Sequence, residues 1–182
     1  MCVPEEIDKV LFTEEEIEKR VEEMGAELTR EYSGKNPLFI CVLKGSCVFF
    51  ADLIRKVRCP IEVEFIRISS YRGAVSGELS VNEEDCPDIR GRDVVIVEDI
   101  IDTAKTLAKL KSLFLEQNPR SLKIASFLDK PARRVVNGFE ADYTGYSIDD
   151  LFVVGYGLDF SQKYRNLPYI GVLNPNKITV LS

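Results

Sequence analysis

Two segments of this chain are apolar almost without interruption, PLFICVL (37–43) and DVVIVE (93–98). Such strands are buried on both faces, as happens when helices cover both sides of a parallel sheet. IEVEFIRI (61–68) instead alternates apolar and polar residues, so we expect it to have one wetted face or to lie near an edge. Further strands are expected at 121–128, around 141–148, at 151–156 and at 169–173.

Helical patterns separate these strands. Thr13 followed by Glu16 forms a capping box, which predicts the start of the first helix. Its apolar stripe comprises Ile17, Val21, Met24 and Leu28. Other helices are expected at 48–57 and from about 103 to 117. The alternation of strands and helices with short links predicts an α/β fold with a mainly parallel sheet, and we expect residues 1–182 to form a single domain.

The segment 69–91 breaks this pattern because it is rich in glycine, serine and acidic residues. Loops of this length are uncommon in compact domains and are usually functional. Within it, ELSV (78–81) has the composition of a short strand.

The composition excludes several classes of function. The chain has 182 residues, a net charge of −6, no histidine and five cysteines. The acidic balance disfavours a broad nucleic-acid surface, and the absence of histidine removes the usual zinc ligand. No apolar run is long enough to span a membrane, and the N-terminus lacks a secretory pattern. We therefore expect a cytoplasmic protein whose thiols are reduced and mostly buried.

The strand expected at 93–98 runs directly into a group of acidic residues, Glu98, Asp99 and Asp102. Ligands of parallel α/β sheets bind beyond the carboxyl ends of the strands. The small and hydroxyl residues of 103–106 follow, where the free N–H groups of a helix start can bind phosphate. The pattern fits a sugar-phosphate site. It fits equally well a structural alternative, in which Asp102 is an N-cap and the other two acids are solvated.

Other phosphate-binding motifs are absent from the sequence. No GxxxxGK[ST] motif occurs, and the late Gly155–Tyr156–Gly157 has Phe160 where a third glycine would be needed.

Five segments resemble type I phosphoribosyltransferases, most closely their hypoxanthine-guanine branch. EDIIDTAKT (98–106) resembles the phosphoribosyl-pyrophosphate motif, and LKGS (43–46) resembles the LKGG pyrophosphate loop. SSYRG (69–73), DK (129–130) and LFVVGYGLDFSQKYRNLPYIGVL (151–173) resemble the flexible loop, the purine-contacting lysine and the C-terminal base segment. The resemblance implies a type I phosphoribosyltransferase (Rossmann-like) fold, with a small hood built from terminal segments.

The resemblance also implies an activity. The chain would transfer the 5-phosphoribosyl group of 5-phosphoribosyl 1-pyrophosphate to hypoxanthine or guanine, with xanthine as a further candidate. The products would be IMP, GMP or XMP and pyrophosphate. Mg²⁺ would be the cofactor, and the protein would be a homodimer or homotetramer that binds neither nucleic acid nor a membrane.

Residue roles carry over position by position. Asp102 would be the general base, and Glu98 and Asp99 would hold the ribose hydroxyls and, with Asp159, support Mg²⁺. The remaining roles are these: Thr103, Ala104, Lys105 and Thr106 for the 5′-phosphate; Lys44, Gly45 and Arg165 for pyrophosphate, with a cis peptide at Lys44; Ser70 and Tyr71 for closing the flexible loop; Lys130, Phe152 and Val153 for the purine.

Taken singly, several of these side chains have ordinary explanations. Phe152 suits core packing, Lys130 and Arg165 suit a protein surface, and Tyr71 suits an ordinary loop. Ala104 and Ser46 depart from the family pattern, which has glycine at both positions, and we expect the backbone at Ala104 to be compatible with a Cβ atom.

Three rival functions remain at this stage. One is transfer to another base, such as xanthine or a pyrimidine. Another is a regulatory protein that senses phosphoribosyl pyrophosphate while binding nucleic acid, which would be expected to have a basic face. The third is a phosphosugar-binding module without turnover, in which Asp102 would be dispensable.

Overall fold

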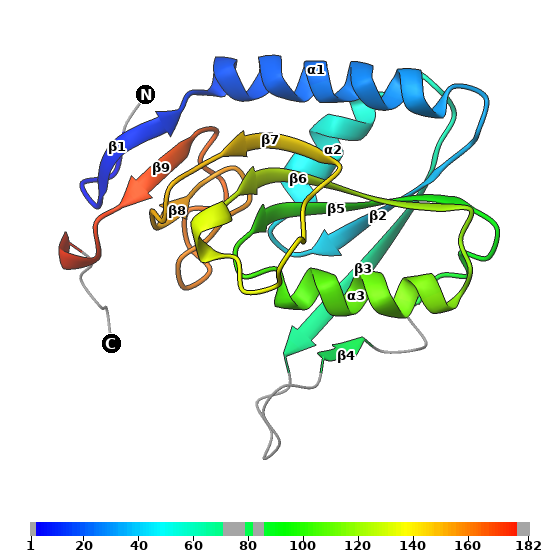
Figure 1. Ribbon diagram of the computed structural model, residues 1–182. Coiled ribbons are helices and arrows are strands. Elements are labelled where there is room, and N and C mark those ends of the chain that lie inside the picture. The colour runs from blue at the N-terminus through cyan, green and yellow to red at the C-terminus, as the bar shows by residue number, and fades with distance from the viewer. Residues whose placement is uncertain (1–2, 71–78, 82–85, 178–182) are drawn as a thin grey trace.

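The computed structural model describes residues 3–70, 79–81 and 86–177 (Figure 1). In chain order, the helices and strands of these residues are β1 (Ile7–Phe12), α1 (Glu14–Tyr32), β2 (Leu38–Leu43), α2 (Cys47–Lys56), β3 (Glu62–Ser70), β4 (Leu79–Val81), β5 (Asp93–Ile101), α3 (Lys105–Glu116), β6 (Ser121–Asp129), the 3₁₀ turn η2 (Pro131–Arg133), β7 (Tyr143–Ser147), β8 (Val153–Val154), β9 (Ile170–Leu173) and the 3₁₀ turn η3 (Pro175–Lys177).

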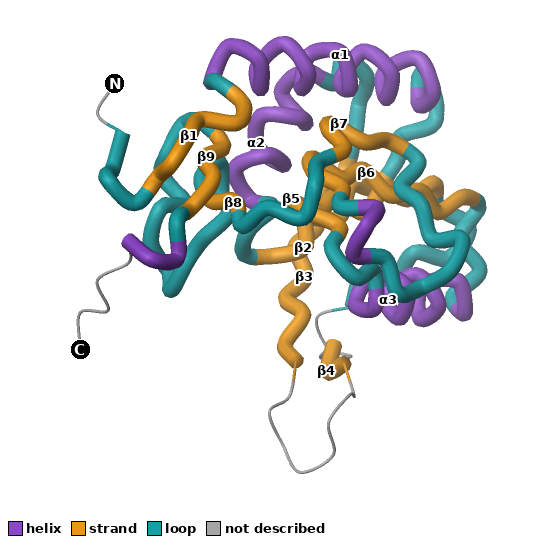
Figure 2. Tube along the Cα trace, turned by 60° about the vertical axis from the view of Figure 1, so that its left-hand side comes forward, coloured by secondary structure: helices purple, strands orange, loops and turns teal. Residues whose placement is uncertain are grey.

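The larger sheet has the strand order β4-β3-β2-β5-β6-β7. Its strands are parallel except for β4, which runs antiparallel to β3. Helices α1 and α2 cover one face and α3 covers the other (Figures 1 and 2). The predicted α/β architecture with a mainly parallel sheet is therefore confirmed.

Strand β5 is buried on both faces, as its apolar sequence predicted. Val95 and Val97 belong to the core beneath α1 and α2. Val94 and Ile96 belong to the core beneath α3. Because both faces are packed, β5 holds whatever follows its carboxyl end on a rigid base.

The first helix begins as the capping box predicted. The Thr13 N–H donates to Glu16 Oε2 at 2.8 Å, and the Glu16 N–H donates to Thr13 Oγ1 at 3.3 Å. The predicted apolar stripe is buried against the sheet. None of the helices in the described part of the chain has the length and apolar composition to cross a membrane.

A second, smaller sheet has the order β1-β9-β8 and lies at one end of the larger sheet (Figure 1). It joins the two ends of the chain, since Ile7 pairs with Leu173. This sheet matches the hood that the family resemblance implied. The sequence did not predict β1, and the strand expected at 151–156 is only Val153–Val154, because Gly155 turns the chain with φ +98°.

Strand β3 lies near the edge of the sheet, as its alternating sequence predicted. Its neighbour β4 pairs only with residues 68–70, so the earlier part of β3 is uncovered on that side. Val63 and Phe65 are 40% and 50% exposed, although the Phe65 ring contacts Phe50 of α2 with ring centroids 5.4 Å apart. The surface of β3 beside α2 is therefore apolar and open to solvent.

Candidate active site

The residues expected at the site gather at the carboxyl ends of three adjacent strands. Lys44 directly follows β2, Asp102 directly follows β5 and Lys130 directly follows β6. The Lys130 N–H donates to the carbonyl oxygen of Ile101 at 2.9 Å, so Asp102 and Lys130 begin from adjacent backbone positions. The sheet order thus brings residues far apart in sequence to one edge, where parallel α/β proteins bind ligands.

Glu98 and Asp99 lie within β5, which continues three residues beyond the predicted strand end. The backbone N–H groups of Asp99 and Ile100 donate to these carboxylates at 3.2 and 2.9 Å. Burial raises the pKa of Glu98 well above its usual range, and the Asp99 carboxylate raises it further. A cation or sugar hydroxyls would relieve this unfavourable proximity of two carboxylates.

The described residues include no group of three or more Asp, Glu, His or Cys side chains arranged to hold a metal ion. Asp159, expected to join Glu98 and Asp99 at the metal, instead forms an ion pair with Arg165 at 2.7 Å. A pair of carboxylates still suits Mg²⁺, which takes few protein ligands and completes its shell with water and substrate phosphates.

Gly45 allows the loop after β2 to approach β5 very closely. A Cβ atom on Gly45 would lie 1.6 Å from Asp99 Oδ2, and a Cβ atom on Gly157 would lie 2.1 Å from the Gly45 carbonyl oxygen. The Leu43–Lys44 peptide is cis, as the resemblance implied. Ser46 has φ −71° and its hydroxyl donates to the Val42 carbonyl, so this position does not require glycine.

The start of α3 forms a shallow pocket of about 120 Å³, lined by Glu98 and by residues 100–107. No side chain caps this helix. Its first N–H groups are therefore available to an anion, and the positive end of the helix dipole points toward the pocket. This arrangement agrees with the predicted phosphate seat.

The expectation for Ala104 was wrong. Its backbone has φ +64°, in the left-handed region, where a Cβ atom costs about 1–2 kcal/mol. The Ala104 side chain is buried in the core that α3 covers. The backbone turn that starts α3 is therefore retained despite the alanine, and packing of the methyl group offsets part of the strain.

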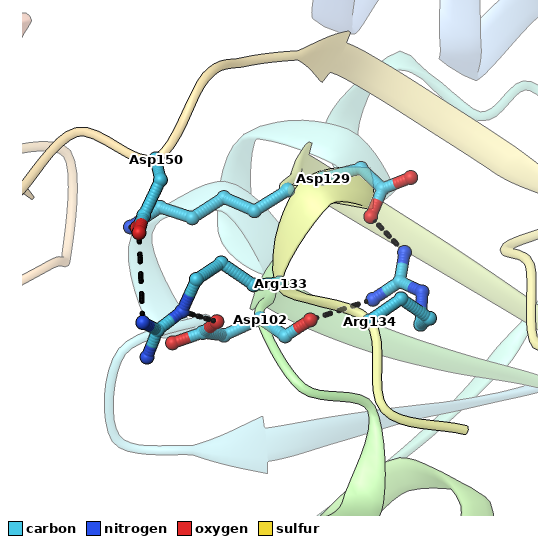
Figure 3. A network of polar contacts seen from close by, with 6 residues as sticks. Asp102, Asp129, Arg133, Arg134 and Asp150 are labelled. Carbon is cyan, nitrogen blue, oxygen red and sulfur yellow. Dashed lines mark hydrogen bonds and ion pairs between the residues drawn. The ribbon is translucent and has the colours of Figure 1, made fainter.

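Asp102 and Lys130 are linked by other charged side chains (Figure 3). Arg133 Nε donates to Asp102 Oδ1 at 2.9 Å, and Arg133 also lies 3.5 Å from Asp150. Lys130 is only 8% exposed, and its Nζ lies 3.7 Å from Asp150 Oδ1. Arg134 donates to the Asp102 carbonyl oxygen at 2.8 Å.

The side chain of Phe152 does not pack in the core. The residue is 49% exposed, and its ring contacts Phe160 edge-on with centroids 5.7 Å apart. Val153 is buried and pairs with Val172 in the small sheet. An exposed aromatic ring next to a fixed strand is suited to stacking against a flat ligand.

Arg165 lines a different and larger pocket of about 720 Å³, which lies between α1, α2 and residues 156–168. Its guanidinium also donates to the Gly157 carbonyl oxygen at 2.7 Å. Volume alone would favour this pocket as the binding site. We favour the strand ends, because the paired carboxylates, the open helix start and the buried lysine lie there.

Two residues expected in the flexible loop remain predictions. Ser70 is the last residue of β3, and nothing is said of its side chain, whereas Tyr71 lies outside the described residues. The thiols differ partly from expectation. Of the four described cysteines only Cys41 is buried, which raises the pKa of its thiol to about 11, and Cys47 is exposed.

The sequence did not single out Arg133, Arg134 or Asp150. Their signal was present in the sequence, since two arginines follow Lys130 closely and two aspartates precede Phe152. Each looked like an ordinary surface charge, and only the fold brings them to Asp102 and Lys130.

A model of the phosphoribosyl transferase domain matches residues 9–161. The chain is 49% identical over 170 residues to a hypoxanthine-guanine phosphoribosyltransferase of Streptococcus pneumoniae, covering 92% of this chain and 94% of that protein. It is 48% identical to the enzyme so named from Bacillus subtilis, covering 93% and 95%. A crystal structure of a hypoxanthine phosphoribosyltransferase from Staphylococcus aureus superposes with a TM-score of 0.89 at 41% identity, covering 96% and 95%.

Gly45→Ala should weaken binding of 5-phosphoribosyl 1-pyrophosphate by at least about tenfold, because the new methyl group would displace Asp99 or the loop. Isothermal titration calorimetry measures the affinity. Gly34→Ala is the matched control, since a Cβ atom there meets nothing within 4 Å and the residue is remote from the site. Equal affinities for both variants would contradict the role given to this close approach.

Proposed function

The chain belongs to the phosphoribosyl transferase family, and from that premise we propose that it transfers a 5-phosphoribosyl group to hypoxanthine or guanine. The donor is 5-phosphoribosyl 1-pyrophosphate, and the products are IMP or GMP and pyrophosphate, as expected of a purine salvage enzyme. Xanthine is a further candidate acceptor. The observation that carries this proposal is the adjacency of Asp102 and the nearly buried Lys130 beside an open helix start.

Lys130 supports a 6-oxopurine as the acceptor. Its ammonium group is almost withdrawn from solvent, yet its ion pair with Asp150 is long, at 3.7 Å. A charged group in this setting gains from a further acceptor, and the carbonyl oxygen of hypoxanthine or guanine supplies one. Adenine presents an amino donor at the same position, which would face the ammonium unfavourably. The exposed ring of Phe152 supports stacking on the base.

The reaction requires a proton to leave the purine. The bond between C1′ and the pyrophosphate oxygen breaks and its electron pair leaves with pyrophosphate, while a purine ring nitrogen bonds to C1′. The proton of that nitrogen passes to the Asp102 carboxylate, which becomes neutral. The backbone N–H groups of 103–106 hold the 5′-phosphate, and Glu98 and Asp99 accept from the ribose hydroxyls.

Mg²⁺ is proposed as the cofactor, held near Glu98 and Asp99, with Asp159 available if its ion pair with Arg165 opens. When bound, it supplies positive charge that stabilises the leaving pyrophosphate. Lys44, Gly45 and Arg165 are proposed to contact pyrophosphate, Ser70 and Tyr71 to close over the site, and Val153 to offer its backbone to the base. We propose that residues 1–182 act as one domain in the cytoplasm, where the free thiols would stay reduced.

A homodimer or homotetramer is also proposed. The exposed apolar side chains Val63 and Phe65 on β3 support it, because a second copy of this chain could remove them from water. Burial of a phenylalanine side chain contributes roughly 1.5–3 kcal/mol.

The activity is tested by incubating the protein with 5-phosphoribosyl 1-pyrophosphate, Mg²⁺ and each of guanine, hypoxanthine, xanthine, adenine and uracil. Nucleotide and pyrophosphate should form with guanine and hypoxanthine. Asp102→Asn should lower kcat by roughly 10²–10⁴-fold while donor binding persists, because the proton acceptor is lost. Absence of product with every purine would refute the proposed function, and an unaltered kcat would refute the role of Asp102.

Assembly is tested by analytical ultracentrifugation. Phe65→Asp should shift the protein toward monomer, because a carboxylate would have to be buried at the interface. Leu115→Asp is the matched control, since Leu115 is similarly exposed, at 51%, but lies on α3 across the sheet. A monomeric wild-type protein, or a Phe65→Asp variant that assembles normally, would show the surface to be misassigned.

A further inference from the structure

Four charged side chains alternate in sign between the residues assigned to proton transfer and to base recognition (Figure 3). Asp102 contacts Arg133 at 2.9 Å, Arg133 contacts Asp150 at 3.5 Å, and Asp150 contacts Lys130 at 3.7 Å. Three separate segments contribute: the end of β5, the residues after β6, and the link between β7 and β8. The two intermediate residues, Arg133 and Asp150, have no role in the proposed function so far.

The two neighbouring arginines hold different parts of Asp102. Arg134 is nearly buried, pairs with Asp129 and donates to the backbone carbonyl of Asp102. Arg133 is half exposed and donates to the Asp102 side chain. Arg134 therefore fixes where the backbone of Asp102 lies, whereas Arg133 fixes how its carboxylate is turned.

The contacts of Arg133 contribute little to folding. The side chains of Arg133, Asp102 and Asp150 are 46%, 43% and 52% exposed. Exposed ion pairs typically stabilise a protein by about 0–1 kcal/mol. Stability alone therefore does not explain why Arg133 lies between two carboxylates at this edge of the sheet.

Proton transfer places a specific demand on Arg133. A guanidinium beside a carboxylate favours the ionised form, so an arginine bound only to Asp102 would oppose its protonation. When the proton of the purine ring nitrogen reaches Asp102, the carboxylate loses its charge and Arg133 loses that ionic partner. Asp150 offers a second carboxylate on the other side of the same guanidinium.

Resting on the proposed function, we infer that Arg133 and Asp150 are positioning residues for this reaction. Arg133 holds Oδ1 of Asp102, so that Oδ2 is presented to the purine N–H. Asp150 retains the guanidinium as Asp102 becomes neutral, and its weak hold on Lys130 leaves that ammonium free to turn to the purine carbonyl. The charge of Arg133 is thus compensated before and after proton transfer.

The inference predicts that the effects of two substitutions do not multiply. Asp150→Asn should lower kcat about tenfold, because Arg133 then has only Asp102 as an ionic partner. Adding Arg133→Ala should raise kcat of that variant several-fold, although Arg133→Ala alone should lower kcat by turning the carboxylate loose. Coupled neighbours commonly interact by 0.5–3 kcal/mol in such cycles, enough to be resolved by steady-state kinetics.

The matched control is the Asp88–Arg90 ion pair, which is exposed, has a distance of 2.7 Å and precedes the opposite end of β5. Asp88→Asn and Arg90→Ala, singly and together, should leave kcat unchanged. Thermal melting of every variant checks folding. As a second readout, guanidinium ion at millimolar concentration should partly restore kcat of Arg133→Ala and have no such effect on Arg90→Ala.

Losses from Asp150→Asn and Arg133→Ala that multiply, or a wild-type kcat in Asp150→Asn, would overturn the inference while wild-type turnover upholds the proposed function. A wild-type protein without turnover on any purine would overturn both.

Discussion

The repulsion and desolvation of two adjacent carboxylates, Glu98 and Asp99, at the end of a buried strand is the constraint on which the site depends. Burial of Glu98 opposes its ionised form, and Asp99 adds to this. Such a pair persists only because β5 is packed on both faces and cannot move the acids into water. The site therefore keeps a standing preference for cations and hydroxyl groups, which a sugar pyrophosphate with Mg²⁺ would supply.

The rest of the site is arranged around this strand end by close backbone contacts. Gly45 approaches Asp99 so closely that no larger residue fits, and Gly157 packs on Gly45 from the other side. The left-handed backbone of Ala104 starts α3 at the point where a phosphate needs free N–H groups. Several kcal/mol of unfavourable electrostatics and backbone strain are thus concentrated here, and the two hydrophobic cores offset them.

The sequence predicted those features that depend on local patterns. The capping box at Thr13, the doubly buried β5 and the near-edge β3 all follow from periodicity and hydrogen-bonding chemistry that act within a few residues. Strand β1 was missed because its partner β9 lies at the other end of the chain, so pairing rather than propensity creates it. Ala104 was misjudged because the helix start and the core impose a φ that alanine alone would avoid. Arg133 and Asp150 were missed because their role depends on which strands are neighbours.

A crystal structure of the protein with GMP and Mg²⁺ would test the central claim most directly. The chain offers two pockets, and the larger one, beside α1 and α2, is not the one that we assign. We predict the 5′-phosphate on the N–H groups of 103–106, the ribose hydroxyls on Glu98 and Asp99, and the purine carbonyl on Lys130. A nucleotide bound in the larger pocket, with Glu98 and Asp99 free of ligand, would contradict the account.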